Sequence, residues 1–327
     1  MICDKSVSHH WLAVLDRIEP ATIGPMAALL TMLLAFSILS PYFLTPSNLT
    51  NVLVQSAPLL ILAAGQTFAL LMGGLDLSQG SIVSLVSVVT AGVMMHHTLA
   101  LGAAAGLGVG FGISLVNGLL IGRAHIQPFI VTLGTLYIAA GLAMVYSGGS
   151  SIFGLPKPDV DYFFWFGGGF VGPFPVPVLI AALLIAAIYV VLGRTRFGRH
   201  VYAVGGNESV AVMSGIEVGR VKIVIYLISG GCASIAGFLM SGRVISGQPL
   251  LGAGDILLQS IGAVIIGGTS VFGGQGGVLR TVLGVFIITF MVNGLNLLAI
   301  DTFAQQVIIG AIIILSVWVN SLRRRRA

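Results

Sequence analysis

Long apolar runs separated by short polar segments are the feature that most constrains this chain. A helix that crosses the roughly 30 Å hydrocarbon core of a membrane needs about 17–25 apolar residues, and runs of this length recur from residue 21 to residue 321. Only 8% of the 327 residues are charged, whereas a soluble domain usually carries about 25%. No soluble fold of this length could bury so much apolar surface. We therefore predict an all-α polytopic membrane protein.

The runs predict about ten membrane spans. The first run is treated as a span and not as a cleaved signal peptide, because it is about 20 residues long and ends in "SPYFLTPSN". Only "HHT" divides residues 79–122 and only "GGQGG" divides residues 255–299, so eight or nine spans remain open. The predicted spans are 21–40, 51–72, 79–96, 98–122, 127–146, 175–193, 221–242, 255–272, 278–299 and 303–321.

The basic residues predict which side of the membrane each segment faces. With ten spans and the N-terminus inside, thirteen of the fifteen lysines and arginines fall in inner segments, and only Lys157 and Arg243 fall outside. Basic residues favour the cytoplasmic side. Both ends are therefore expected in the cytoplasm, with a tail over residues 1–20, a membrane domain over 21–321 and a basic tail over 322–327.

Two segments between spans are long enough to have a role of their own. Residues 147–174 fall outside and are rich in glycine, proline and aromatic residues, which suits either a short amphipathic element on the outer surface or a plain connection. Residues 194–220 fall inside and form the largest polar island. There, Gly205 and Gly206 can turn the chain, Asn207 is a good helix N-cap, and Gly215 is a suitable C-cap. The pattern predicts a short helix over "ESVAVMSG".

The second half of the chain echoes the first. "LAAGQTFALLMGGLDLSQGSIVSL" at 62–85 is similar to "LQSIGAVIIGGTSVFGGQGGVLRTVLG" at 258–284: in each, an apolar run leads to a glycine pair, a short polar stretch and a new apolar run. The pairs are Gly73–Gly74 and Gly267–Gly268. Interrupted helices at corresponding places line the pathways of transporters. Glycines also allow membrane helices to pack closely, so both interpretations stay open.

Asp76 is the one acidic residue placed where an ion-coupled carrier would need a carboxylate. The distribution of basic residues puts it at the inner end of the second span, and the matching segment after Gly267–Gly268 carries no acid. We therefore expect Asp76 to cap the next helix or to brace an inner gate, bonded to Ser78 or to a nearby backbone amide. The phosphate-binding pattern G-x-x-x-x-G-K-[ST] is absent. No cofactor or metal is expected, and the energy source is expected to be a separate motor.

Four stretches carry a family resemblance. "GGLDLSQGSIVSLVSVVTAG", "NGLLIGRAHIQPFIVTLGT", "GRHVYAVGGNESVAVMSGI" and "AVIIGGTSVFGGQGGVLRTVLG", followed by "NGLNLL", together resemble the permease subunit of ribose-type ABC sugar importers over residues 45–320. The resemblance implies a type II importer fold in a bacterial inner membrane and a second permease copy or a sister permease. It also implies cytoplasmic ATPase subunits, which bind the ATP, and a periplasmic or extracellular sugar-binding protein. No nucleic acid is expected as a partner.

The resemblance also suggests roles for individual residues. Residues 194–220 would be the loop that couples to the ATPase, through Gly205, Gly206, Asn207, Glu208, Ala211, Ser214 and Gly215. Neutral polar residues on the spans could line the sugar path or simply bond neighbouring helices; these are Gln66, Asn117, Asn293 and Asn296. A gate or structural break is expected at Gly73, Gly74, Asp76, Ser78, Gly267 and Gly268.

Other functions stay open at this point. An ABC permease of the same architecture could carry a nucleoside, a signalling furanose or a branched-chain amino acid. An ion-coupled secondary carrier has thin support, since Asp76 is its one candidate carboxylate. For a membrane-embedded enzyme we find no catalytic constellation, so the chain is expected to be a non-catalytic transport subunit.

Overall fold

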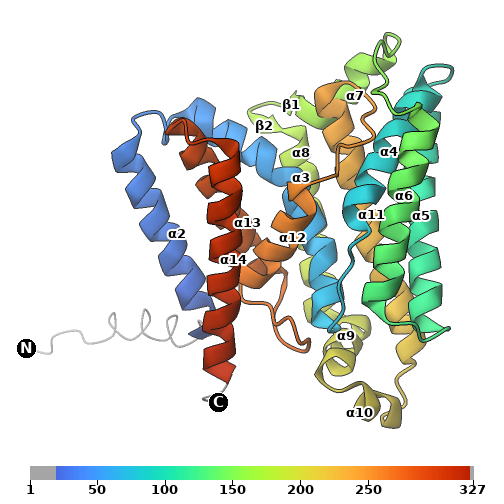
Figure 1. Ribbon diagram of the computed structural model, residues 1–327, viewed down its shortest axis with the longest axis vertical. Helices are drawn as coiled ribbons and strands as arrows, with labels where there is room; N and C mark the ends of the chain where they lie inside the picture. The colour runs from blue at the N-terminus through green and yellow to red at the C-terminus, as the bar shows by residue number, and fades with distance from the viewer. Residues whose placement is uncertain (1–19, 325–327) are drawn as a thin grey trace, which may run out of the picture.

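The computed structural model describes residues 20–324, so most of the predicted N-terminal tail and the last three residues of the basic tail lie outside the described part of the chain. The described residues form thirteen helices and one small hairpin (Figure 1). In chain order they are α2 (Pro20–Leu39), α3 (Pro46–Leu71), α4 (Gln79–Met94), α5 (Leu99–Gly122), α6 (Pro128–Ser147), α7 (Asp159–Gly168), β1 (Phe170–Val171), β2 (Phe174–Pro175), α8 (Val176–Arg194), α9 (Arg196–Gly206), α10 (Glu208–Met213), α11 (Val218–Val244), α12 (Asp255–Ile266), α13 (Val278–Leu297) and α14 (Thr302–Arg324).

Each predicted span coincides with one helix, and the all-α polytopic class is confirmed. Within residues 20–324, six helices are long and apolar enough to cross a membrane, namely α3, α5, α6, α8, α11 and α13. The apolar parts of α2, α4, α12 and α14 are shorter. Ten crossings therefore stay a prediction. The span predicted over 255–272 ends earlier than expected, because α12 stops at Ile266.

The core of the molecule is built on α3 and α11. From Ser56 to Leu71 every residue of α3 is buried, and α11 packs against α3, α4 and α5. Small residues make this close packing possible. A β-carbon at Gly102 would lie 2.7 Å from the Thr90 carbonyl oxygen of α4, and one at Gly110 would overlap the Ser234 hydroxyl of α11. A β-carbon at Gly106 would overlap the Thr90 hydroxyl, so Gly102, Gly106 and Gly110, spaced four apart, serve helix packing.

Two helices begin partway along the length of the molecule, α4 at a buried residue and α12 at a half-buried one (Figure 1). Residues 73–78 lead from the end of α3 back into the molecule before α4 begins, and residues 245–254 do the same between α11 and α12 (Figure 1). The two helix starts meet. A β-carbon at Gly80 would lie 2.5 Å from the Gly252 carbonyl oxygen and 3.3 Å from the Leu257 side chain. The amide of Gly252 also donates to Ser84 Oγ at 2.9 Å.

The two ends of the molecule carry different extra elements. α9 and α10 lie at one end, and α7 with the β1–β2 hairpin lies at the other (Figure 1). The segment 147–174 therefore contains a helix, α7, which docks on the end of α11: Phe163 is buried, and its ring centroid lies 5.2 Å from that of Phe238. Its placement on a membrane surface stays a prediction.

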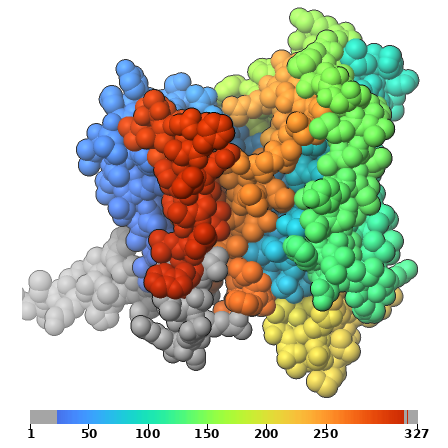
Figure 2. All heavy atoms as spheres, viewed as in Figure 1, coloured from blue at the N-terminus to red at the C-terminus, as the bar shows by residue number. Residues whose placement is uncertain are grey.

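Between these ends, α6 and α14 frame one face of the molecule. In the space-filling view, the atoms of α4 and α12 are visible between α14 and α6 (Figure 2). Large apolar side chains project from both framing helices, among them Tyr137 and Val145 of α6 and Val307 and Ile314 of α14. Such an apolar exterior suits a lipid or protein environment and not water.

Candidate coupling and gating site

The two glycine pairs lie at helix ends of the same type, but shifted by one position: the left-handed residue is the first glycine of one pair and the second glycine of the other. After α3, Gly73 has a φ of +83°, its amide donates to the Leu70 carbonyl at 2.8 Å, and the amide of Gly74 donates to Ala69 at 2.9 Å. After α12, Gly268 has a φ of +96° and makes the corresponding bond to Ile265 at 2.9 Å. Both are left-handed glycine caps of the Schellman type. The sequence similarity between residues 62–85 and 258–284 thus reflects the same type of cap at the ends of α3 and α12.

Asp76 lies in the segment that re-enters the molecule after the first glycine pair, and it is only 1% exposed. One carboxylate oxygen accepts from the Ser78 amide at 3.0 Å and from the Ser78 hydroxyl at 2.6 Å. The other oxygen accepts from Ser229 Oγ of α11 at 2.6 Å. Ser78 is therefore a partner, as the sequence predicts, and Ser229 is a second one. A gating role for Asp76 stays a prediction.

A buried polar network surrounds this carboxylate. Gln79 Nε2 donates to Ser229 Oγ at 2.9 Å, and Asn117 Nδ2 of α5 donates to Ser78 Oγ at 2.9 Å. With its amide oriented to match its neighbours, Gln66 of α3 accepts from the Asp76 amide and donates to the Asp76 carbonyl, each at 3.2 Å. Buried polar groups need such partners. The network joins α3, α4, α5 and α11 around one short segment.

The remaining polar residues predicted for a sugar path lie elsewhere. Asn293 of α13 and Asn48 of α3 exchange two hydrogen bonds, of 2.8 and 2.9 Å. Asn296 is exposed and accepts from Gln305 Nε2 at 2.8 Å. The placement of Gln66, Asn117 and Asn293 favours bonding between helices, which is the alternative that the sequence left open. The role of all four residues in a path stays a prediction.

Sequence reasoning missed Asn48, Gln79 and Ser229 as members of these contacts. Gln79 and Ser229 sit beside glycines in apolar segments, in "SQGS" and "SGG". Polar residues at such positions are a usable signal, since a membrane helix hides them against another helix. The pairing across helices, however, depends on the fold and cannot be read from one sequence.

The polar island 194–220 folds into two helices with well-formed caps. Asn207 Oδ1 accepts from the Val210 amide at 3.1 Å, as expected for an N-cap. Gly215 has a φ of +79°, and the Ile216 amide donates to the Ala211 carbonyl at 3.1 Å, which completes a Schellman cap. The short helix predicted over "ESVAVMSG" is confirmed as α10.

One detail of this prediction is wrong. The chain turns at Asn207, and Gly205 and Gly206 are the last residues of α9. The reason for a glycine at position 205 is packing: a β-carbon there would overlap the Leu71 carbonyl oxygen at the end of α3. The backbone of α9 thus rests directly on the backbone of α3.

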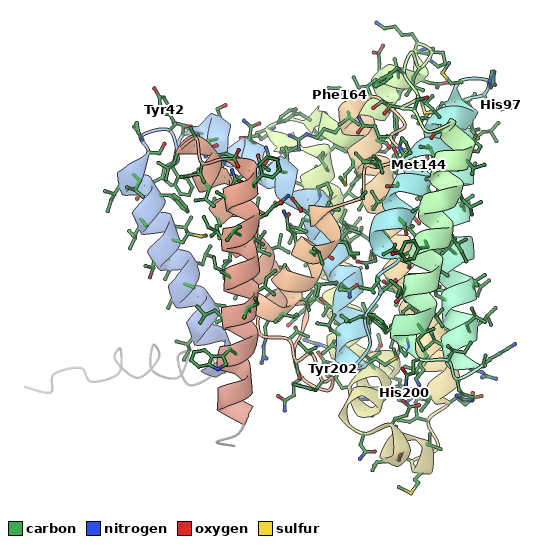
Figure 3. All side chains as sticks on the ribbon, in the orientation of Figure 1. Tyr42, His97, Met144, Phe164, His200 and Tyr202 are labelled. Carbon is green, nitrogen blue, oxygen red and sulfur yellow. The ribbon has the colours of Figure 1, made fainter. Side chains whose placement is uncertain are left out.

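The helix α10 presents an apolar surface at the end of the molecule. Val210, Val212 and Met213 are 51%, 57% and 79% exposed, whereas Ala211 is buried. Glu208 forms an ion pair of 2.7 Å with Lys222 at the start of α11, which holds the helix in place. His200 and Tyr202 lie on the adjacent α9, far from His97 and Phe164 at the opposite end (Figure 3). Exposed apolar side chains on an ordered helix are typical of a protein contact.

A helical, largely apolar fold with two helices that begin partway along its length, and a capped helical island at one end, defines a multi-pass membrane protein. The chain belongs to the family described as the permease component of the branched-chain amino acid transport system, whose model matches residues 48–317. No solved structure matches the chain.

Three curated relatives are similar over nearly their whole length. The ribose import permease protein RbsC of Bacillus subtilis (strain 168) is 40% identical over 297 residues, which cover 90% of this chain and 91% of the relative. RbsC of Escherichia coli (strain K12) is 38% identical over 300 residues, covering 91% and 93%. The D-allose transport system permease protein AlsC of the same strain is 37% identical over 302 residues, covering 91% of each chain.

Proposed function

We propose that the chain is the membrane permease subunit of an ABC importer that moves a monosaccharide across a bacterial inner membrane. The observation that carries this proposal is the identity of 37–40% to ribose and allose permeases over about nine-tenths of each chain. The sugar passes through chemically unchanged. Separate ATPase subunits hydrolyse the ATP, and a solute-binding protein delivers the sugar.

The end of the molecule with α9 and α10 is the face for the ATPase. Its support is the apolar surface of Val210, Val212 and Met213 on a helix that caps and an ion pair hold in place. The first described turn of α2 and the last of α14 lie toward the same end of the molecule (Figure 1). Together with the distribution of basic residues, this arrangement supports a cytoplasmic location for both chain termini.

The sugar path lies where α4 and α12 begin, between this chain and a second permease copy. The support is the contact of the start of α4, at Gly80, with the segment before α12, at Gly252, and the visibility of both helices between α6 and α14 (Figure 2). Transporters bind substrates near the membrane midplane, at interrupted helices from two repeated halves. In this proposal the repeated units are α3–α4 and α11–α12, a different pairing from the sequence similarity, which matches α3–α4 with α12–α13, and the two units run in opposite directions through the membrane. A path with few charges suits a neutral sugar.

A branched-chain amino acid is the second candidate substrate, because the matching family is described by that transport system. Uptake by cells separates the two. A strain that lacks this gene, complemented with the wild-type chain, is given radiolabelled ribose, allose or leucine. We expect the chain to restore the uptake of a sugar and to leave leucine uptake unchanged. Restored leucine uptake, with no change for either sugar, would show that the substrate class is wrong.

A further inference from the structure

Three backbone segments meet at the end of the molecule where α9 and α10 lie, with glycines at every contact. The amide of Gly274, in the loop between α12 and α13, donates to the Leu71 carbonyl at 2.8 Å. A β-carbon at Gly205 would overlap that carbonyl and lie 2.8 Å from the Gly274 nitrogen. A β-carbon at Gly273 would lie 2.7 Å from the Gly205 oxygen and 2.9 Å from the Gly73 nitrogen. We call Gly73, Gly205, Gly273 and Gly274 the glycine junction.

A side-chain bond holds the same loop to α9 at a second point. The hydroxyl of Tyr202 donates to the Gly276 carbonyl at 2.9 Å. Within the loop, the Ser270 amide donates to the Gln275 carbonyl at 2.9 Å. The loop is thus ordered by its own bonds and attached to α9 through Tyr202 and through the glycine junction.

Each segment of the junction leads to a part that the proposed function requires to move. α9 continues through Asn207 into α10, on the face for the ATPase. Leu71 and Gly73 open the re-entering segment that contains Asp76, and the loop joins α12 to α13. Close-packed atoms transmit displacement with little compression. At the junction, backbone touches backbone, so no side chain can change rotamer and absorb the movement.

We propose that the glycine junction is the joint through which ATPase-driven movement of α9 and α10 reaches both interrupted regions of the permease. Gly205 and Tyr202 are positioning residues in this joint, and the proposal rests on the proposed function. Close packing alone is the competing explanation for the glycines. The two explanations predict different results. If the glycines serve packing alone, a variant loses sugar transport and ATP hydrolysis together. If they form a joint, the variant loses sugar transport but keeps ATP hydrolysis.

The test compares Gly205 with Gly193, a glycine of α8 that lies outside the loop expected to couple to the ATPase, in the complete complex. Gly205→Ala introduces a methyl group that overlaps Leu71, whereas Gly193→Ala introduces the same group where no atom of a neighbouring segment lies within 4 Å. Each variant is reconstituted with its ATPase subunits and binding protein in proteoliposomes. ATP hydrolysis is measured together with uptake of the sugar that the wild type imports, chosen from radiolabelled ribose and allose. We expect Gly205→Ala to lower the number of sugars imported per ATP about tenfold, and Gly193→Ala to match the wild type.

If the Gly205→Ala variant fails to assemble with its partner subunits, Tyr202→Phe provides the test of the joint. It removes only the hydroxyl that bonds to Gly276, and we expect a loss of about threefold in sugars per ATP with ATP hydrolysis retained. If both variants import as many sugars per ATP as the wild type, or if uptake and ATP hydrolysis fall in parallel, the proposed joint is wrong. Failure of the proposed function looks different, because the wild-type complex itself would then show no ATP-driven sugar uptake.

Discussion

At the scale of the residue, the best-defined feature is the carboxylate of Asp76. Its burial would be costly without partners, and both of its oxygens are bonded, to Ser78 and Ser229. The acid therefore acts as a fixed acceptor that holds a short extended segment between α3 and α4.

Replacement of Asp76 tests this structural role. Asp76→Leu leaves the Ser78 amide and the Ser229 hydroxyl without an acceptor, and we expect a loss of about 2 kcal/mol in the free energy of unfolding. Asp76→Asn keeps one acceptor oxygen for Ser78 and should lose less. The free thiol of Cys232 is buried, so its reaction with a fluorescent dye reports thermal unfolding in a Cys3→Ser background. Equal melting temperatures for the Leu variant and the wild type would contradict the role.

The Asn variant also separates structure from charge. It removes the negative charge but keeps a side chain that can bond to both serines. We expect it to retain most of the ATP-driven uptake. A variant that melts like the wild type but imports no sugar would show instead that the charge itself takes part in transport.

At the scale of the element, α10 is a short helix fixed by local chemistry. Its N-cap, its left-handed C-cap at Gly215 and its ion pair to Lys222 define its position. These devices leave three apolar side chains exposed. Because an isolated helix of six residues has little stability of its own, the caps and the ion pair are what keep this surface in one orientation.

A charge placed on this surface should prevent the ATPase contact. Met213 is 79% exposed, so Met213→Asp should leave folding intact and reduce co-purification of the ATPase at least about tenfold. Phe153→Asp is the matched control, since Phe153 is 65% exposed in the segment before α7 and should not affect ATPase binding. If the Met213→Asp variant co-purifies with as much ATPase as the wild type, α10 is not part of the ATPase interface.

The elements also show what a single sequence can and cannot reveal. Helix positions and the caps at Asn207 and Gly215 followed from apolar length and from local backbone chemistry, which act within a few residues. The contact of Gly205 with Leu71 and the bond of Asp76 to Ser229 did not, because they join segments more than one hundred residues apart. Local chemistry therefore predicts a turn at Gly205 and Gly206, whereas Gly205 serves a tertiary contact.

At the scale of the whole molecule, the fold separates two tasks. In the proposed function, one end presents α9 and α10 to the ATPase, and the start of α4 meets the segment before α12 at Gly80 and Gly252. The glycine junction contacts α9 on one side and the segments that lead into α4 and α13 on the other. The sequence lacks the phosphate-binding pattern G-x-x-x-x-G-K-[ST], and we propose that a separate ATPase supplies the energy.

The central claim is that separate ATPase subunits drive sugar movement through this chain, and uptake into proteoliposomes tests it most directly. The chain is reconstituted with or without its ATPase subunits and binding protein, and radiolabelled ribose or allose is offered with ATP or with a proton or sodium gradient. We predict sugar accumulation only when ATP and all partner subunits are present. Accumulation by the chain alone, driven by an ion gradient, would contradict the account.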